Sequence, residues 1–175
     1  MFKFDLQLCA DAVHGKKIAY LYRLLSEASK SDAAHVAFTT ENSTSISRDA
    51  DAIATKDGSI RTLNEVEIEI STTAILAVGD TMIEKLKKAL IDGEKVEIWE
   101  VNLAEAGSKS NTFKARYYQG YVTEFEQTSS AEDHVECTLN FGIEGCGAEG
   151  DATVSEAQQV LIETYGFADT TKTGA

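Results

Sequence analysis

Residues 145–150 match the spacing GxGxxG of dinucleotide-binding turns. In such turns a helix opens directly after the glycines, and an acidic residue about 20 positions later holds the ribose. Here residues 151–154 follow before any helix signal, and only 25 residues remain in the chain. Glu144 and Glu149 would also place negative charge beside the phosphates. We therefore interpret these glycines as a flexible exit from a final strand, and predict no nucleotide or other cofactor.

A second stretch, Asp49 to Gly58, superficially suggests a calcium-binding loop. An EF-hand loop needs an oxygen ligand at its fifth position, glycine at its sixth and glutamate at its twelfth. These positions hold Ile53, Ala54 and Ile60. A polar arm with turns is the better interpretation, and weak cation binding is the alternative.

The remaining reactive side chains lack the spacing of a catalytic or metal site. Glu65, Glu67 and Glu69 place three carboxylates on one strand face, a pattern more typical of a solvated sheet face than of acid–base catalysis. The histidines show no metal-ligand spacing, and neither HExxH nor GxSxG is present. Cys137 fits a small packing residue within a strand. The three histidines without metal-ligand spacing are His14, His35 and His134. We predict that the protein is not an enzyme and holds no metal.

Length and composition indicate one domain spanning residues 1–175. There is no apolar run long enough to span a membrane, and the first residues lack the pattern of a secretory signal, so we expect none. Three unevenly spaced cysteines, Cys9, Cys137 and Cys146, argue against a disulfide framework and fit a reducing cytoplasm. The net charge of −13, with 16 basic against 29 acidic residues, disfavours tight binding to nucleic acid. The chain also has no proline, which suits strand edges that pair with copies of the same chain.

The elements that must position these side chains are mostly strands. Alternation of apolar and polar residues predicts strands at 17–25, 65–71, 94–102, 112–128, 134–143 and around 35–40, with a bulge or bend at Gly120. One helix is predicted at 79–94, with Thr81 and Glu84 as its capping box and Gly93 as its C-cap. A weaker helix is predicted at 155–165, with Ser155 and Gln158 as its box.

This order of strands, one helix and further strands predicts a mainly β or α+β fold, not an alternating βαβ fold. The polar segment 39–64 is too long for an ordinary connection, and such segments are usually functional or disordered. Its threonine, serine and isoleucine content also suits an extended hairpin arm that pairs with something else.

The ordered set of these pieces resembles the major tail protein, or tail tube protein, of long-tailed, non-contractile bacteriophages. The resemblance covers roughly residues 16–155 and is most specific in YYQGYVT and in FGI followed by the glycines. The other segments that carry it are KIAYLYRL, AFTTE, SRDAD, KDG, EVEIE, GDTMI, VEIWE and AEDHVE.

The resemblance implies a β-sandwich or barrel with one flanking helix near 80–92, assembled into hexameric rings that stack around a DNA-conducting channel. It implies that residues 39–64 form an arm between rings. Residues 151–175 are expected to form a C-terminal extension that contains the short helix predicted at 155–165. The candidate arm residues are Ser45, Arg48, Asp49, Asp51, Lys56 and Asp57, and the candidate acidic sheet face is Glu65, Glu67 and Glu69.

The partners so implied are other copies of the chain, the tape-measure protein, the tail terminator and distal tail proteins. DNA would only pass through, and an acidic lumen would repel its phosphates. The protein would reside in the virion tail after assembly in the host cytoplasm. The alternative from another class is a monomeric β-sandwich module that binds carbohydrate or a host surface through Trp99, Tyr117, Tyr118 and Tyr121, although core packing is the preferred role for these aromatics.

Overall fold

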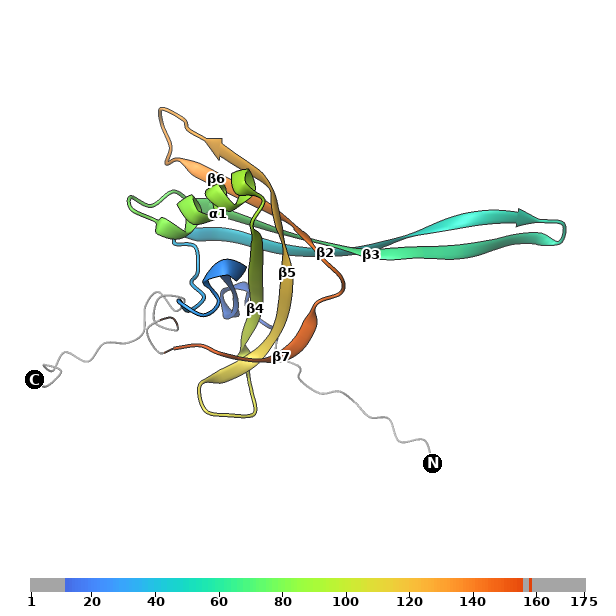
Figure 1. Ribbon diagram of the computed structural model, residues 1–175, viewed down its shortest axis with the longest axis horizontal. Helices are drawn as coiled ribbons and strands as arrows, with labels where there is room; N and C mark the ends of the chain where they lie inside the picture. Colours follow the sequence, from blue (N-terminus) through green and yellow to red (C-terminus); the bar gives the residue numbers. More distant parts are fainter. Residues whose placement is uncertain (1–11, 156–157, 159–175) are drawn as a thin grey trace, which may run out of the picture.

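Seven strands and one α-helix make up this computed structural model, which describes residues 12–155 and residue 158 (Figure 1). The predicted mainly β class with a single flanking helix is confirmed. The elements are β1 Ile18–Leu24, β2 Thr39–Thr55, β3 Gly58–Ile75, α1 Thr81–Asp92, β4 Lys95–Ala106, β5 Thr112–Thr128, β6 Glu136–Ile143 and β7 Ala148–Thr153, with short 3-10 turns at Gly15–Lys17 and Leu25–Glu27.

All strands join one antiparallel sheet in the order β1-β4-β5-β6-β3-β2. The 17-residue strand β5 holds the sheet together, because β4 lies along one of its edges while β6 and β7 share the other. The two ends of this order also meet through side chains: the Tyr20 hydroxyl of β1 lies 2.7 Å from the Thr44 hydroxyl of β2. Burial raises the pKa of Tyr20 to about 12, so this hydroxyl stays protonated at physiological pH. The sheet is therefore curled upon itself.

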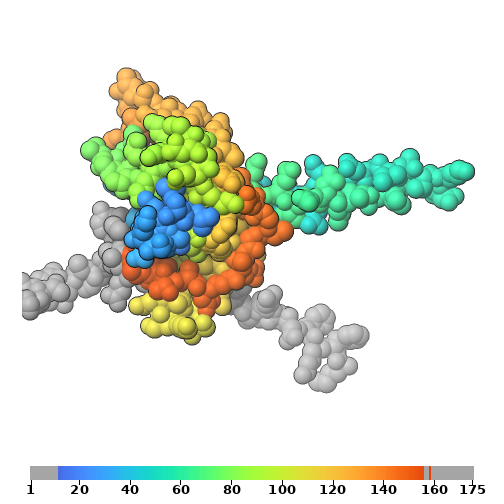
Figure 2. All heavy atoms as spheres, viewed as in Figure 1, coloured from blue at the N-terminus to red at the C-terminus, as the bar shows by residue number. Residues whose placement is uncertain are grey.

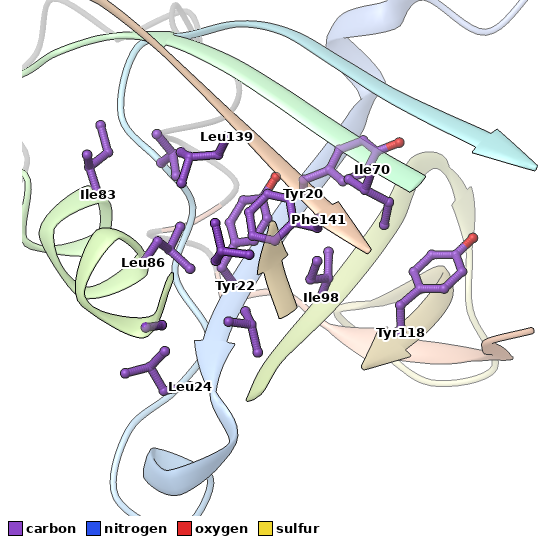
Figure 3. Packing of buried hydrophobic residues seen from close by; sticks show 14 of the residues in the cluster. Tyr20, Tyr22, Leu24, Ile70, Ile83, Leu86, Ile98, Tyr118, Leu139 and Phe141 are labelled. Atoms are coloured by element: carbon purple, nitrogen blue, oxygen red, sulfur yellow. The ribbon is translucent and has the colours of Figure 1, made fainter. Parts of the chain in front are cut away.

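The main core fills the inside of this curl and is covered by α1 (Figure 3). Tyr22 and Phe141 stack with ring centroids 5.4 Å apart, and Ile83 and Leu86 of α1 are buried against the sheet. The Tyr22 hydroxyl is satisfied at Thr72, so the ring can be fully buried without an unpaired polar atom. The core residues on the strands are Tyr20, Tyr22, Leu24, Ile68, Ile70, Ala74, Val96, Ile98, Tyr118, Val122, Cys137, Leu139 and Phe141.

Asp80, rather than the predicted Thr81, caps the N-terminus of α1. Its carboxylate accepts hydrogen bonds from the amides of Met82 and Ile83, at 2.9 and 3.3 Å. The predicted box of Thr81 and Glu84 is therefore wrong by one residue, because two good capping residues are adjacent and the carboxylate takes the role. The predicted C-cap is confirmed: Gly93 has a φ of 68°.

A smaller cluster on the opposite face of the sheet contains Leu21, Val101 and Val154, with Trp99 packed against it. Beside it a buried carboxylate, Glu97, accepts hydrogen bonds from Arg23 Nε at 2.8 Å and the Tyr117 hydroxyl at 2.7 Å. The Arg23 guanidinium also lies 5.0 Å from the centre of the Trp99 ring.

Two local predictions need correction. The strand expected around 35–40 begins only at Thr39, because Phe38 adopts a left-handed backbone with a φ of 50°. Gly120 is not the bulge of β5; the register shifts between Val122 and Glu124. Gly120 instead permits close approach of β6, since a Cβ there would lie 2.2 Å from the Gly142 carbonyl oxygen.

Of the helix predicted at 155–165, only the box lies among the described residues. The Ser155 amide donates to Gln158 Oε1, and the Gln158 amide donates to Ser155 Oγ. Residues 159–165 lie outside the described residues. No helix in the described part of the chain is both long and apolar enough to cross a membrane.

Candidate functional site

The longest projection of the molecule is the hairpin of β2 and β3, which extends well beyond the body (Figures 1 and 2). Its strands pair continuously from Thr39 with Ala74 to Thr55 with Gly58, apart from two register shifts. β6 accompanies β3 only as far as Glu69. Residues 47–67, here called the free arm, therefore form a ribbon in which each strand pairs only with the other, among the residues described. At about 3.3 Å per residue the free arm reaches about 25 Å.

A bulge in β3 divides the free arm. Arg48 pairs with Val66 and Ala50 with Leu63, so Asn64 and Glu65 together lie opposite Asp49. Because cross-strand partners share a face, the register sorts the side chains into two sets. The first set is apolar and cationic: Ile46, Arg48, Ala50, Ala52, Arg61, Leu63 and Val66. The second set is acidic near the body and apolar near the tip: Ser45, Ser47, Asp49, Asp51, Ile53, Ile60, Thr62, Glu67 and Glu69.

The candidate arm residues are therefore spread along the hairpin and do not converge on one site. Ser45 lies opposite Glu69 where the hairpin leaves the body, and Arg48 and Asp49 flank the bulge. Asp51 lies opposite Thr62 farther out. Lys56 and Asp57 form the turn, closed by a 2.9 Å hydrogen bond from the Thr55 hydroxyl to the Gly58 carbonyl.

Carboxylates gather on the outward face of β2, β3, β6 and the second half of β5, the side away from the main core. Among the described residues in these positions there is no lysine or arginine. A cleft of about 300 Å³ opens here, and Asn140 Nδ2 donates to Glu124 Oε2 at 2.7 Å beside it. We call this surface the acidic sheet face; its acidic residues are Glu41, Glu67, Glu69, Glu124, Glu126 and Glu136, set among serine, threonine and asparagine.

Glu67 and Glu69 thus share one face with four carboxylates that were not predicted to lie there: Glu41, Glu124, Glu126 and Glu136. Glu65, predicted beside Glu67 and Glu69, lies in the bulge instead. Glu124 and Glu126 flank Phe125 in a predicted strand, so the sequence already indicated that both carboxylates face away from the core. The sequence does not specify the registers of β5 and β3 on the two edges of β6, which place these residues on the same face as Glu67 and Glu69.

Gly145 and Gly147 lie in the connection between β6 and β7, and Gly150 lies within β7. Gly145 and Gly147 each have a φ of 69°, and a Cβ on Gly147 would lie 2.6 Å from the ring of Tyr118. β7 begins directly after Gly147 and pairs with the first half of β5. A flexible exit from a final strand was therefore the wrong interpretation. A helix does not open at the glycines, and the geometry of a phosphate-binding turn is not formed.

The other reactive residues lie apart from one another. Among the described residues there is no group of three histidine, cysteine, aspartate or glutamate side chains able to hold a metal ion. Cys137 is buried, donates to the Ala74 carbonyl at 3.4 Å, and has its pKa raised by burial, as expected of a packing residue. Cys146 is exposed in the glycine turn, and Cys9 lies outside the described residues.

The aromatic residues of the alternative binding module do not form an exposed platform. Tyr118 is part of the main core. Trp99 and Tyr117 pack on each other with ring centroids 5.2 Å apart, and both are partly buried. Of the four, only Tyr121 is substantially exposed, and Lys95 covers its ring. This arrangement supports packing roles and gives no continuous surface for stacking a sugar.

Comparison with known proteins identifies the architecture. The profile of the phage tail tube protein family matches residues 12–147. A protein of Staphylococcus phage phiMR25 whose name assigns it to the tail is 35% identical over 159 residues, which cover 89% of this chain and 81% of that protein. The SPP1 tail tube protein superposes with a TM-score of 0.73 at 16% identity, covering 94% of this chain and 95% of that one. A chain from a gene transfer agent virion gives a TM-score of 0.59 at 14% identity, covering 79% and 99% of the two chains.

Proposed function

Because this chain belongs to the phage tail tube protein family and is a structural subunit of a tail tube, we propose that six copies form a ring and that rings stack into a DNA-conducting tube. The free arm would connect successive rings, and the acidic sheet face would line the channel. The chain would contribute no catalytic step.

The single observation that carries this proposal is the free arm itself. A two-stranded hairpin is at best marginally stable in water without a third strand or a packed face. Yet the free arm exposes three large apolar side chains, Ile53, Ile60 and Leu63, and Ile46 is exposed directly before it. A neighbouring subunit would cover these side chains and hydrogen-bond the outer strand edges. The candidate contact residues along the hairpin are Ser45, Arg48, Asp49, Asp51, Lys56 and Asp57.

The acidic sheet face fits the wall of a channel that conducts DNA. A surface that binds nucleic acid neutralises phosphates with lysine and arginine, whereas the described outward positions of this face offer carboxylates and small hydroxyl groups. At physiological salt the Debye length is about 8 Å, so the charge acts mainly near the wall. That range suffices to keep phosphates from settling on it.

The proposed partners follow from this role. Other copies of the chain would form the tube, a tape-measure protein would occupy the lumen before DNA, and terminator and distal tail proteins would close the two ends. Assembly would take place in the host cytoplasm before the tail joins the virion.

Negative-stain microscopy of concentrated protein tests the proposal. The intact chain should form rings or tubes. A variant in which Asn-Gly replaces residues 49–65 should fold and form no tubes, because its hairpin closes directly after the pair Arg48 and Val66. Featureless particles from the intact chain at high concentration would contradict the proposal.

Assembled tubes should also show no measurable affinity for DNA at physiological salt. Replacing Glu67, Glu69 and Glu124 by lysine should create an affinity that weakens steeply with added salt. Submicromolar, salt-sensitive binding by the unmodified tube would instead indicate a cationic surface organised for nucleic acid.

A further inference from the structure

Two unusual side chains lie at the end of the long hairpin opposite its tip. Phe38, just before β2, is 70% exposed, and Val78, just after β3, is fully exposed. Their segments are tied together: the Ile75 amide donates to the Phe38 carbonyl at 3.1 Å, and the Ala37 amide donates to Asp80 Oδ2 at 3.1 Å. These hydrogen bonds bring Phe38 and Val78 to the same end of the molecule, and the two exposed apolar side chains are here called the base patch.

The backbone at Phe38 makes this exposure notable. Its φ of 50° lies in the left-handed region, which costs an aromatic residue energy and persists only where the surroundings enforce it. An aromatic side chain held in this way outside the core is suited to a contact with another molecule.

The free arm carries the matching surface at its tip. Ile53 and Ile60 form a cross-strand pair and are 49% and 56% exposed. The same chain cannot bring this pair to its own base patch. The 17 residues of β2 alone separate them by about 50 Å along a paired ribbon, and the tip and the β3–α1 connection lie at opposite ends of the molecule (Figure 1).

Charge also distinguishes the two ends. Residues 52–61 at the tip contain Lys56 and Arg61 against one carboxylate, Asp57. The connections at the other end, residues 34–38, 76–80 and 129–135, contain no lysine or arginine. The last two connections are adjacent, because the Leu76 amide donates to the Val135 carbonyl at 2.8 Å. Their carboxylates are Asp80, Glu132 and Asp133.

We propose that the tip pair Ile53 and Ile60 of one subunit docks on the base patch, Phe38 and Val78, of a second copy in the next ring. The inference rests on the proposed stacking of rings and names the surfaces that would make it. The contact is head-to-tail, since the two surfaces differ, and each subunit both gives and receives one. Such a heterologous contact extends without closing on itself. The charges of the two ends would favour the correct orientation.

Thiol cross-linking tests the pairing directly. In a chain with Cys9 and Cys146 changed to serine, Ile60→Cys and Val78→Cys are introduced together, and assembled tubes are treated with a short bis-maleimide. A ladder of covalent oligomers is expected in denaturing gels, whereas either cysteine alone should yield monomers. Dimers from Ile60→Cys alone would indicate a tip-to-tip contact and overturn the proposal, as would tubes of the double variant that give no ladder.

A second measurement uses Phe38→Ser combined with Val78→Ser. We expect the concentration needed for tube formation to rise at least about tenfold, while free rings persist and thermal unfolding stays near that of the unmodified chain. Ile91→Ser is the matched control, because Ile91 is 77% exposed on α1, and it should change this concentration less than about twofold. If the Phe38 and Val78 variant formed tubes at the same concentration as the unmodified chain, the base patch would not be the docking surface, while the proposed function would stand. Failure of the unmodified chain to form tubes would instead refute the proposed function.

Discussion

The buried ion pair of Arg23 and Glu97 offers a sharp test of the fold. Replacing Arg23 by methionine keeps much of the apolar stem but leaves Glu97 buried, with the Tyr117 hydroxyl as its remaining described donor. Removing one member of a buried pair typically costs 3–5 kcal/mol. Since the Arg23 side chain is 19% exposed, water can reach part of the site, and we expect the low end, about 3 kcal/mol.

This magnitude can be converted into a melting shift. An unfolding entropy of about 2.1 cal/mol/K per residue over 175 residues gives about 0.37 kcal/mol/K. Arg23→Met should therefore lower Tm by about 8 °C, measured by calorimetry at neutral pH. Glu97→Gln in the same chain should restore much of the loss, because a neutral amide costs less to bury than an unpaired carboxylate.

The exposed pair of Lys88 and Asp92, 4.0 Å apart on α1, supplies the control. Lys88→Met should change stability by less than about 0.5 kcal/mol. The reasoning would be refuted if Arg23→Met melted within 2 °C of the unmodified chain, or if adding Glu97→Gln brought no recovery.

Three further changes can be followed by urea unfolding. Gly120→Ala should lower the free energy of unfolding by about 1–3 kcal/mol, because its Cβ would meet the Gly142 carbonyl and β5 and β6 would have to separate. Gly150→Ala is the control and should be nearly neutral, because the space at its Cβ is open. An equal loss in both variants would contradict the proposed clash. Asp80→Ala should lower the free energy of unfolding by about 1–2 kcal/mol, because α1 loses its N-terminal cap. Asp80→Asn should retain most of the stability, because asparagine can also cap a helix. Equal losses in the two variants would show that the cap is not the cause. The Lys114 ammonium, with further hydrogen bonds from Ser108, holds the pKa of Asp151 well below its usual range, so this contribution is complete above about pH 4 and is lost as pH falls further. Lys114→Met should therefore lose less stability than the unmodified chain between pH 5 and pH 2, and an unchanged acid dependence would count against the pair.

Strand alternation and helix periodicity carry much of the fold. Residues 112–128 form β5 with the predicted bounds, because their apolar residues pack on the sheet: Phe113 and Ala115 on the smaller cluster, Tyr118 and Val122 on the main core. The apolar stripe and terminal glycine of 79–94 likewise place α1 correctly. These elements are predictable because each depends on contacts whose sequence spacing is visible locally.

Features that depend on contacts between distant segments could not be predicted from the sequence. β7 has the sequence AEGDAT, with no apolar alternation, and becomes a strand only because β5 offers an open edge. The bulge opposite Asp49 and the alignment of Glu124 with Asn140 depend on register, which no local pattern specifies. The segment 39–64 was expected to suit a hairpin arm from its composition, but the pairing of its first ten residues with residues 66–74 beyond it is a structural finding.

The topology also dictates an order of events during synthesis. The hairpin and α1 close over short separations, whereas Ile18 of β1 must find Asn102 of β4, and Glu69 must find Gly142. Long-range pairings are slow, because loop-closure entropy is lost before the contacts form. The chain emerges from the ribosome N-terminus first, so the ribbon can form while the rest of the sheet still awaits β5 and β6. A nascent subunit can therefore expose the apolar side chains of the free arm before the rest of the sheet has folded. Because an isolated hairpin is only marginally stable, we expect incomplete chains to be prone to premature association with one another.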